Sequence, residues 1–300
     1  NKLKNNYDLC IVSSWDAAKL AFLSDMKFIF YFIGDDIRYP PFSEKIISED
    51  ISNLKLLEKR SFSYRDIFNK ALICVTGSEE LFKILKTYRP ESVRIDRTIV
   101  TPNSFNENII PVDIKKNKFT FFSPTRIGME KGTNLLWKAI TLCKSDFDII
   151  QINWIDRKNL VIQKESELLL QQKPSNVYLI DKIKHEEMAK YYLFSDCILG
   201  EMKTGHTNSI EREAALCMKP ILNYNDIESK AFLDGEEIET PFLPKSNDPK
   251  EIARIIDKIV VDKEFRDNLT KNENIFMKNL TDPQKTATEW EFIIKKFLKT

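Results

Sequence analysis

Residues 196–220, DCILGEMKTGHTNSIEREAALCMKP, decide the fold of this 300-residue chain. They begin with a short apolar run, Cys197–Leu199, which has the length and composition of a buried parallel strand. A loop of small and polar residues follows, and residues 210–216 then carry the helix formers Glu, Arg, Ala and Leu. Residues 220–223 can start the next strand. This order is one unit of a doubly wound α/β domain, in which ligands bind at the carboxyl ends of strands, against helix N-termini.

The composition restricts the class of protein further. Three hundred residues suggest about two domains, and 42% hydrophobic residues are enough for ordinary cores. A net charge of +1 gives no overall attraction to nucleic acid or to an anionic membrane, so any anion must bind at a local cluster. Five scattered cysteines without a CxxC indicate free thiols in a reducing, cytoplasmic compartment. Two histidines exclude a His-rich metal site, and no G-x-G-x-x-G or Walker sequence occurs.

A second polar segment, residues 124–133 (PTRIGMEKGT), follows the predicted strand Phe119–Ser123. It places two cations, Arg126 and Lys131, just before a helix predicted at residues 134–143. The free N–H groups of a helix N-terminus add partial positive charge there. Such a site can hold a diphosphate and stabilise the charge that grows when the attached group leaves. Taken alone, these two charges are more typical of a solvated surface turn.

Together the two segments resemble signatures of family 4 of the GT-B glycosyltransferases, which have two Rossmann-like domains facing across a cleft. Asp196, Glu213, Ala214, Cys217 and Pro220 match the family pattern D-x-x-x-x-P-S-x-x-E-G-F-G-x-x-x-x-E-A-M-A-C-G-x-P. Arg126, Glu130, Lys131 and Gly132 match G-R-x-x-x-E-K-G. Both signatures occur in the family's order, which makes coincidence a poor explanation.

The resemblance implies a hexosyltransferase-like enzyme that moves a sugar from a nucleotide-diphosphate-sugar donor to an acceptor hydroxyl. Glu213 would hold the ribose hydroxyls, because one carboxylate accepts hydrogen bonds from two neighbouring hydroxyls. Arg126 and Lys131 would hold the diphosphate and stabilise it as the leaving group, so that no metal is needed. Retention at the anomeric carbon is implied, with no cofactor besides the donor itself. The expected partners are that donor and a glycan, glycoconjugate or lipid-linked acceptor, and no nucleic acid; peripheral membrane association and oligomeric state are left open.

The remaining donor contacts are expected from two loops. Gly205, His206, Thr207, Asn208 and Ser209 would place sugar and phosphate at the helix N-terminus, and Asp181 and Lys182 lie where such enzymes hold the base. One departure from the family is that its sugar-binding Glu falls on Gly205, so the usual sugar contact does not carry over. His206 either contacts donor or acceptor or only occupies the loop. His185 begins an H-E-E-M-A-K-Y-Y helix that lacks the second His of a zinc site, and is expected to be a surface residue.

The N-terminal part predicts strands at residues 7–13, 27–33 and 71–75 and within 93–103, and a helix at 81–88 capped by Ser78. Residues 34–38 (GDDIR) resemble the family's G-S-D-x-R loop, from which Asp36 would face acceptor or donor; the alternative is a solvated turn. Residues 1–112 are expected to form an abbreviated N-terminal domain, completed by a helix at 284–300. Residues 113–283 would form the donor-binding domain. Further N-terminal units are either missing from this sequence or absent from a reduced variant.

Two other functions remain open from the sequence. A sugar-nucleotide epimerase would use the same fold without an acceptor, although no acid and base pair supports it. A non-catalytic nucleotide-sugar-binding protein would fit the Gly205 departure and the short N-terminal domain.

Overall fold

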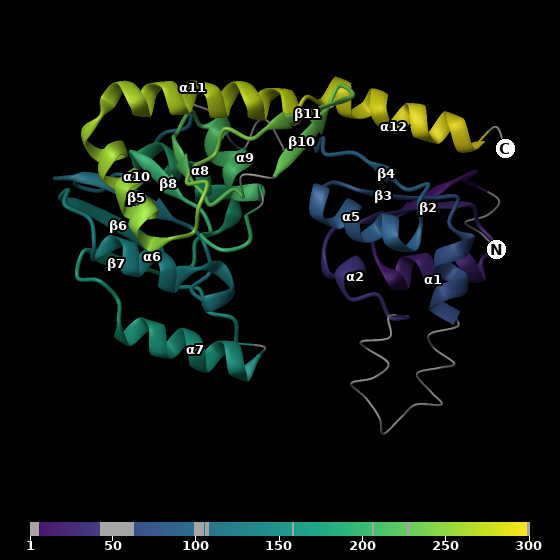
Figure 1. Cartoon of the computed structure of the whole chain (residues 1–300), viewed down its shortest axis with the longest axis horizontal. Coiled ribbons are helices and arrows are strands. Elements are labelled where there is room, and N and C mark those ends of the chain that lie inside the picture. The colour runs from purple at the N-terminus through teal and green to yellow at the C-terminus, as the bar shows by residue number, and fades with distance from the viewer. Residues whose placement is uncertain are drawn as a thin grey trace. The chain divides into compact units, whose positions relative to one another are not determined.

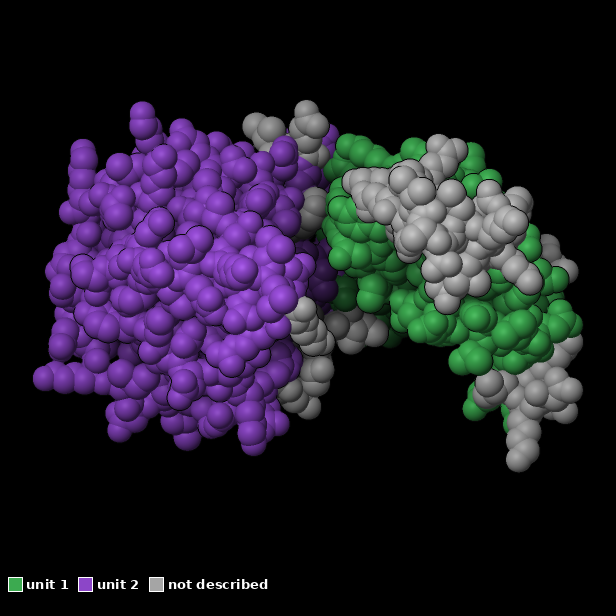
Figure 2. Space-filling model, turned by 90° about the horizontal axis from the view of Figure 1, so that it is seen from below, with its two compact units in different colours: residues 1–99, 231–238, 282–300 green, residues 100–230, 239–281 purple. Residues whose placement is uncertain are grey.

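The computed structural model of the chain describes residues 6–42, 63–98, 105, 108–157, 159–205, 207–226 and 229–298. Its contacts divide the chain into two compact units (Figure 2). Unit 1 holds Asn1–Ile99, Ala231–Ile238 and Asp282–Thr300, and unit 2 holds Val100–Lys230 and Glu239–Thr281. The sequence places the division at residue 112, whereas the contacts place it after Ile99 and add a second, internal segment to unit 1.

Unit 1 is built on a parallel sheet of four strands in the order β1-β2-β3-β4. The strands are β1 (Cys10–Val12), β2 (Phe28–Phe32), β3 (Ile73–Thr76) and β4 (Val93–Arg94). Its helices are α1 (Trp15–Leu23), α2 (Asp35–Arg38), residues 63–70, α5 (Glu79–Tyr88) and α12 (Pro283–Leu298). The predicted cap of α5 is confirmed, because the Ser78 hydroxyl accepts the N–H of Leu81 at 3.3 Å. A helix expected at residues 51–59 and the Pro102-Asn103 segment lie outside the described residues.

The two faces of the unit 1 sheet carry separate cores, as the alternation of side chains along a strand requires. Phe28, Phe30 and Phe32 bury one face, where the Trp15 ring lies 4.9 Å from that of Phe30. Ile29, Ile73 and Val75 bury the other face against Ile293 of α12. Helix α12 therefore belongs to unit 1, as the sequence predicts, with Trp290 and Phe297 packed on this core. Phe292 of the same helix is 71% exposed and does not contribute to this core.

Unit 2 is built on a parallel sheet of five strands in the order β7-β6-β5-β8-β9. The strands are β5 (Phe119–Ser123), β6 (Phe147–Ile152), β7 (Val177–Ile180), β8 (Cys197–Leu199) and β9 (Ile221–Leu222). The chain adds β6 and β7 on one side of β5, then returns to add β8 and β9 on the other. Neighbouring β5 and β8 therefore flank the switch point at which doubly wound sheets bind ligands.

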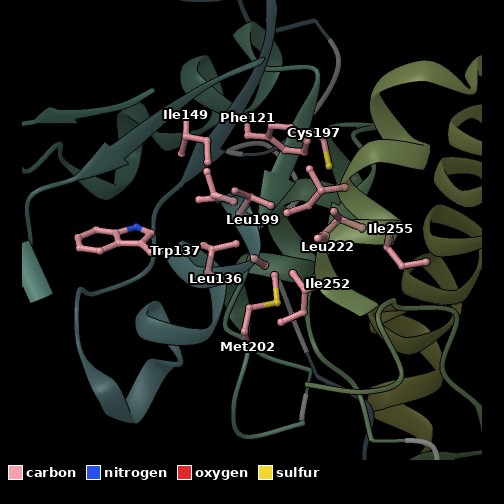
Figure 3. Packing of buried hydrophobic residues seen from close by; sticks show 14 of the residues in the cluster. Phe121, Leu136, Trp137, Ile149, Cys197, Leu199, Met202, Leu222, Ile252 and Ile255 are labelled. Carbon is pink, nitrogen blue, oxygen red and sulfur yellow. The ribbon is translucent and has the colours of Figure 1, made fainter. Parts of the chain in front are cut away.

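Among the described residues of unit 2, α-helices surround the parallel sheet (Figure 1). They are α6 (Thr133–Ile140), α7 (Leu160–Gln171), α8 (Met188–Phe194), α9 (Ser209–Leu216), α10 (Pro249–Val261) and α11 (Lys263–Leu280). Figure 3 shows the main core, in which Phe121, Ile149 and Leu199 of the strands meet Leu136 and Trp137 of α6 and Ile252 and Ile255 of α10. No helix among the described residues combines the length and apolarity needed to cross a bilayer. All five cysteines are free thiols, as predicted.

A hairpin that the sequence analysis did not predict joins unit 1 from within the unit 2 sequence. It consists of β10 (Lys230–Leu233) and β11 (Glu236–Glu239), turned by Asp234 and Gly235 at positive φ. The fully buried Arg97 holds it, with Nη2 at 2.6 Å from Asp234 and Nε at 2.8 Å from Glu289 of α12. The Asp96 carboxylate also accepts the N–H of Phe232 at 2.8 Å. These contacts tie the hairpin to the chain just after β4 and to α12.

Candidate functional site

Three cavities with shared lining residues open where the unit 2 strands end. The first, here the apolar cavity, has about 410 Å³ and is lined by Ile183, Met188, Tyr192 and Glu213 among others. The second, the central cavity, has about 300 Å³ and includes Lys131, Glu201, Asn208 and Glu211. The third, the basic cavity, has about 580 Å³ and includes Asp156 and Arg157. Trp154 lines all three, and Pro124, Ser209 and Ile210 line both the apolar and the central cavity.

Glu213, the residue predicted to bind ribose, lines the apolar cavity with a buried carboxylate. Its Oε1 lies 2.7 Å from Nε2 of His185, and its Oε2 accepts the Tyr192 hydroxyl at 2.9 Å. Burial, and then the Glu213 charge, raise the pKa of Tyr192 well above its usual value, so this hydroxyl stays a donor. Glu213 is therefore not a solvated helix carboxylate; its carboxylate is held in place in a mainly apolar cavity.

His185 is a site residue whose contact the sequence did not predict. Its side chain is 72% exposed, which agrees with the prediction of a surface residue. Its ring nevertheless pairs with Glu213 and lies 5.3 Å from the ring of Phe105. His185 starts a 3₁₀ turn, His185–Glu187, just before α8, whereas Glu213 lies on α9. The pairing follows from the packing of α8 against α9, which no local sequence pattern reports.

Arg126 and Lys131, the predicted diphosphate ligands, both line the central cavity. Each already has a carboxylate partner. Lys131 Nζ lies 2.5 Å from Oε2 of Glu201, whose side chain is only 4% exposed. Arg126 lies 2.8 Å from Asp156 and 3.1 Å from Glu130. The two cations are thus held in place before any ligand arrives, with their charge largely balanced inside the protein.

Two backbone contacts position Lys131 against the β8–α9 loop. The N–H of Met202 donates to the carbonyl of Lys131 at 3.0 Å. Gly132, which follows, has φ +73°, and a Cβ there would lie 2.8 Å from the carbonyl carbon of Met202. Glycine is needed at this position both for its conformation and for its size. The loops after β5 and β8 therefore meet at the switch point, where the sequence predicts a ligand.

The N-terminus of α9 forms one wall of the central cavity. Asn208 and Glu211 form a capping box, in which Oε2 of Glu211 accepts the N–H of Asn208 at 2.5 Å. Glu211 is completely buried, and burial is the main reason that its pKa rises from 4.5 to about 7, with a contribution from the Glu201 charge. Among the described residues its Oε1 has no hydrogen-bond partner.

The other predicted loop residues have different positions. Ser209 is the first residue of α9 and lines the central and apolar cavities. Thr207 is half-buried and Gly205 has φ +74°, but neither lines any of the three cavities described above. His206 lies outside the described residues.

Lys182 contributes to the site and Asp181 does not. The Nζ atom of Lys182 lies 4.7 Å from the centre of the Trp154 ring, and both residues line the apolar and basic cavities. Asp181 is exposed and lines none of the three cavities. The sequence analysis did not single out Trp154 and Asp156, although they closely follow β6 and so lie at the same sheet edge.

Asp36 lies in unit 1, whereas the other predicted site residues belong to unit 2. Its carboxylate accepts the backbone N–H groups of Ile33, Gly34 and Ile37 at 3.1, 2.7 and 3.1 Å. These bonds fold the turn between β2 and α2, which favours the alternative of a structural turn residue. Its neighbour Arg38 forms a two-bond ion pair with Glu80 at 2.8 and 2.6 Å.

The three solved structures compared below share the fold and are distant from this chain in sequence. HepE of Anabaena, in complex with UDP and glucose, is 16% identical with a TM-score of 0.69, over 100% of this chain and 80% of its own. Sucrose-phosphate synthase of Thermosynechococcus elongatus is 14% identical with a TM-score of 0.69, over 99% and 75%. A glycosyltransferase of Rickettsia africae is 14% identical with a TM-score of 0.63, over 97% and 98%. No family model matches the sequence. The predicted fold class is confirmed: the chain is α/β, with the two Rossmann-like domains of the GT-B fold.

Proposed function

We propose that this chain is a glycosyltransferase that moves a sugar from a nucleotide-diphosphate-sugar donor to an acceptor hydroxyl. The observation that carries the proposal is the arrangement of the unit 2 cavities. A buried carboxylate, Glu213, lies in an apolar cavity, and the adjoining central cavity holds Arg126 and Lys131. An apolar surface, two hydroxyls and two phosphates are the successive parts of a nucleoside diphosphate. The apolar and central cavities offer a matching group for each part in that order.

The nucleoside would occupy the apolar cavity. Its base would rest between Trp154 and Ile183, and its ribose hydroxyls would donate to the Glu213 carboxylate. The hydroxyls would share Glu213 with Tyr192 and His185, because a carboxylate has about four acceptor positions. The bound UDP and UDP-glucose of HepE support a nucleotide-sugar ligand for this fold.

The diphosphate would lie in the central cavity, near Ser209 at the N-terminus of α9. Lys131 and Arg126 would balance the charge that develops on the leaving diphosphate, in a site whose donors are already fixed. A metal-independent reaction is part of this proposal, because the family resemblance assigns the diphosphate charge to these two cations. Retention at the anomeric carbon is proposed from the family resemblance, and Asp36 is retained only as a weaker candidate for a contact with donor or acceptor.

The acceptor is proposed to be a glycan, a glycoconjugate or a lipid-linked acceptor, in polysaccharide or glycoconjugate biosynthesis. The free cysteines favour a cytoplasmic location. Family-4 membership is part of the same proposal, because it rests on the two sequence signatures.

A thermal-shift panel tests the donor site. UDP, GDP, ADP and dTDP, each free and as the glucose conjugate, are added to the wild type and to Glu213→Ala. A ligand at 100 times its Kd stabilises the native state by about 2.7 kcal/mol. We expect a rise in Tm for one base in the wild type and a loss of that rise in the variant. Glu187→Ala is the matched control, because Glu187 adjoins the site yet lines none of the three cavities. No rise with any of the eight ligands contradicts the proposal.

Product analysis separates the three functions. The wild type is incubated with the selected sugar nucleotide, with and without candidate acceptors. Appearance of free nucleotide together with a glycosylated acceptor supports the transferase. An epimerised sugar nucleotide without acceptor identifies an epimerase, and intact donor with every acceptor, despite tight binding, identifies a binding protein.

A further inference from the structure

Glu201 is a carboxylate where an anion-binding site would not be expected to have one. It follows β8, lines the central cavity, and has only 3% of its surface exposed. Its Oε2 is bound to Lys131 Nζ at 2.5 Å. A buried negative charge beside the proposed phosphate-binding lysine lowers the affinity for a phosphate. A ligand group that interacts favourably with this carboxylate would account for its position.

The structure leaves Glu201 little freedom to move away. Its carbonyl accepts the N–H of Tyr224 at 3.0 Å. The preceding Gly200 is closely surrounded: a Cβ there would lie 2.5 Å from Oδ1 of Asn223 and 2.6 Å from Oε1 of Glu211. These contacts fix the backbone of Glu201, and the ion pair with Lys131 holds its carboxylate beside the central cavity.

The free nucleotide diphosphate and the sugar nucleotide differ in the charge and in the hydrogen-bond donors that they would place next to the Glu201 carboxylate. The terminal phosphate of the free nucleotide is a monoester-like group with a second pKa near 6, so it carries up to about one more negative charge at neutral pH. The sugar ester lacks that charge and adds hydroxyl donors next to the phosphate. A carboxylate repels the first and accepts hydrogen bonds from the second.

We propose that Glu201 makes the central cavity select the sugar-bearing nucleotide over the free nucleotide diphosphate. It repels the extra charge on the terminal phosphate of the product and accepts a hydrogen bond from a hydroxyl of the donor sugar. This inference rests on the proposed function. Glu201 would thereby assist product release as well as donor binding, and would supply an acidic sugar contact that Gly205 cannot.

The location of Glu201 relative to the other site residues supports this role. The apolar and central cavities adjoin at Ser209 and Ile210, with Glu213 in the apolar cavity and Lys131 in the central one. A ligand that extends from Glu213 past Ser209 to Lys131 reaches Glu201 next, since Lys131 and Glu201 are in contact. The group beyond the phosphates would therefore meet this carboxylate. Glu211, which is completely buried, also lines the central cavity.

The test compares two ligands in two variants by isothermal titration. Glu201→Gln keeps the size and one acceptor oxygen but removes the charge. We expect the variant to bind the free diphosphate about tenfold more tightly, because one like charge is removed, and to bind the glucose conjugate no more tightly than the wild type. Glu130→Gln is the matched control: Glu130 pairs with Arg126 at 3.1 Å but does not line the central cavity. It should change both affinities in the same direction.

A series of ligands on the wild type keeps the inference testable even where Glu201→Gln does not fold. The free diphosphate, its β-methyl ester and its glucose ester are titrated, with the base that the thermal-shift panel selects. The methyl ester has the charge of the sugar nucleotide without its hydroxyls. We expect affinity to increase from the free diphosphate to the methyl ester, and again to the glucose ester.

Two results overturn the inference in different ways. The role of Glu201 is overturned, and the proposed function left intact, by either of two findings. The wild type binds the free diphosphate as tightly as the glucose conjugate or more tightly, or Glu201→Gln changes the affinities for both ligands in parallel. Absence of binding for all four bases, free and esterified, overturns both.

Discussion

Replacement of Glu213 by Gln is the perturbation that tests the ribose contact. The carboxylate is buried, and its two oxygens lie 2.7 and 2.9 Å from His185 and Tyr192. Gln keeps one acceptor oxygen, turns the other into an amide donor, and removes the charge. A hydrogen bond to a charged group contributes about 1.5–3 kcal/mol. Loss of one such bond and weakening of a second predict a cost of about 2–4 kcal/mol in nucleotide binding, or roughly 30- to 1000-fold in Kd.

A cycle with a modified ligand shows whether the contact is direct. Wild type and Glu213→Gln are each titrated with the selected nucleotide diphosphate and with its 2′-deoxy form, and all four Kd values are measured by calorimetry. The wild type should lose at least about tenfold in affinity for the deoxy ligand, and the variant much less, because its partner group is already altered. Melting curves of both proteins show that the variant is folded.

Additivity refutes the reasoning. Independent groups add to within about 0.5 kcal/mol in such a cycle. If Glu213→Gln and the missing 2′-hydroxyl each weaken binding by amounts that simply add, Glu213 does not contact the ribose. Its bonds to Tyr192 and His185 would then be purely structural.

Three further predictions concern charge. Lys131→Met should weaken binding of the diphosphate by about 1.5–3 kcal/mol and reduce its salt dependence, measured by titration at low and high salt; unchanged affinity contradicts its role. Glu211 has a pKa of about 7 in the folded chain against 4.5 as its usual value. It therefore supports the fold fully below pH 4.5, and this support is lost as the pH rises through 7. In urea unfolding, the unfolding free energy of Glu211→Gln should rise relative to that of the wild type by about 3 kcal/mol between pH 4.5 and pH 8. A difference between the two proteins that stays constant with pH contradicts the raised pKa of Glu211. Arg97→Leu removes the buried cation that binds Asp234 and Glu289, whose side chains are 54% and 31% exposed and can be hydrated. It should lower the unfolding free energy by about 1.5–3 kcal/mol, and an unchanged unfolding free energy contradicts the importance of this ion-pair cluster.

Much of the fold could be predicted from apolar runs and turn residues in the sequence. The runs around β2 and β5 are bounded by polar or turn residues, and each strand lies within one residue of its predicted position. The hairpin was missed although Asp234-Gly235 is a strong two-residue turn signal. Its strands are short, and β11 reads EEIE with mostly exposed side chains, so the apolar alternation that marks a strand is absent. What stabilises the hairpin is Arg97, far away in the sequence.

The site was predictable to the extent that strand order determines it. Segments that follow parallel strands gather at one edge of the sheet, so Arg126, Lys131 and Glu213 could be expected at neighbouring cavities. The pairs Lys131–Glu201 and His185–Glu213 could not, because they join residues 70 and 28 positions apart through tertiary packing. Trp154 was partly predictable. Its position after β6 places it at the same edge of the sheet, but only the structure shows that it lines all three cavities.

The most direct test of the account is a crystal structure of the chain with the nucleotide diphosphate that gives the largest thermal shift. The account predicts ribose hydroxyls within hydrogen-bond distance of the Glu213 carboxylate, and phosphate oxygens near Lys131 and Arg126. A nucleotide bound away from Glu213, or with its phosphates outside the central cavity, would contradict the assignment of the donor site.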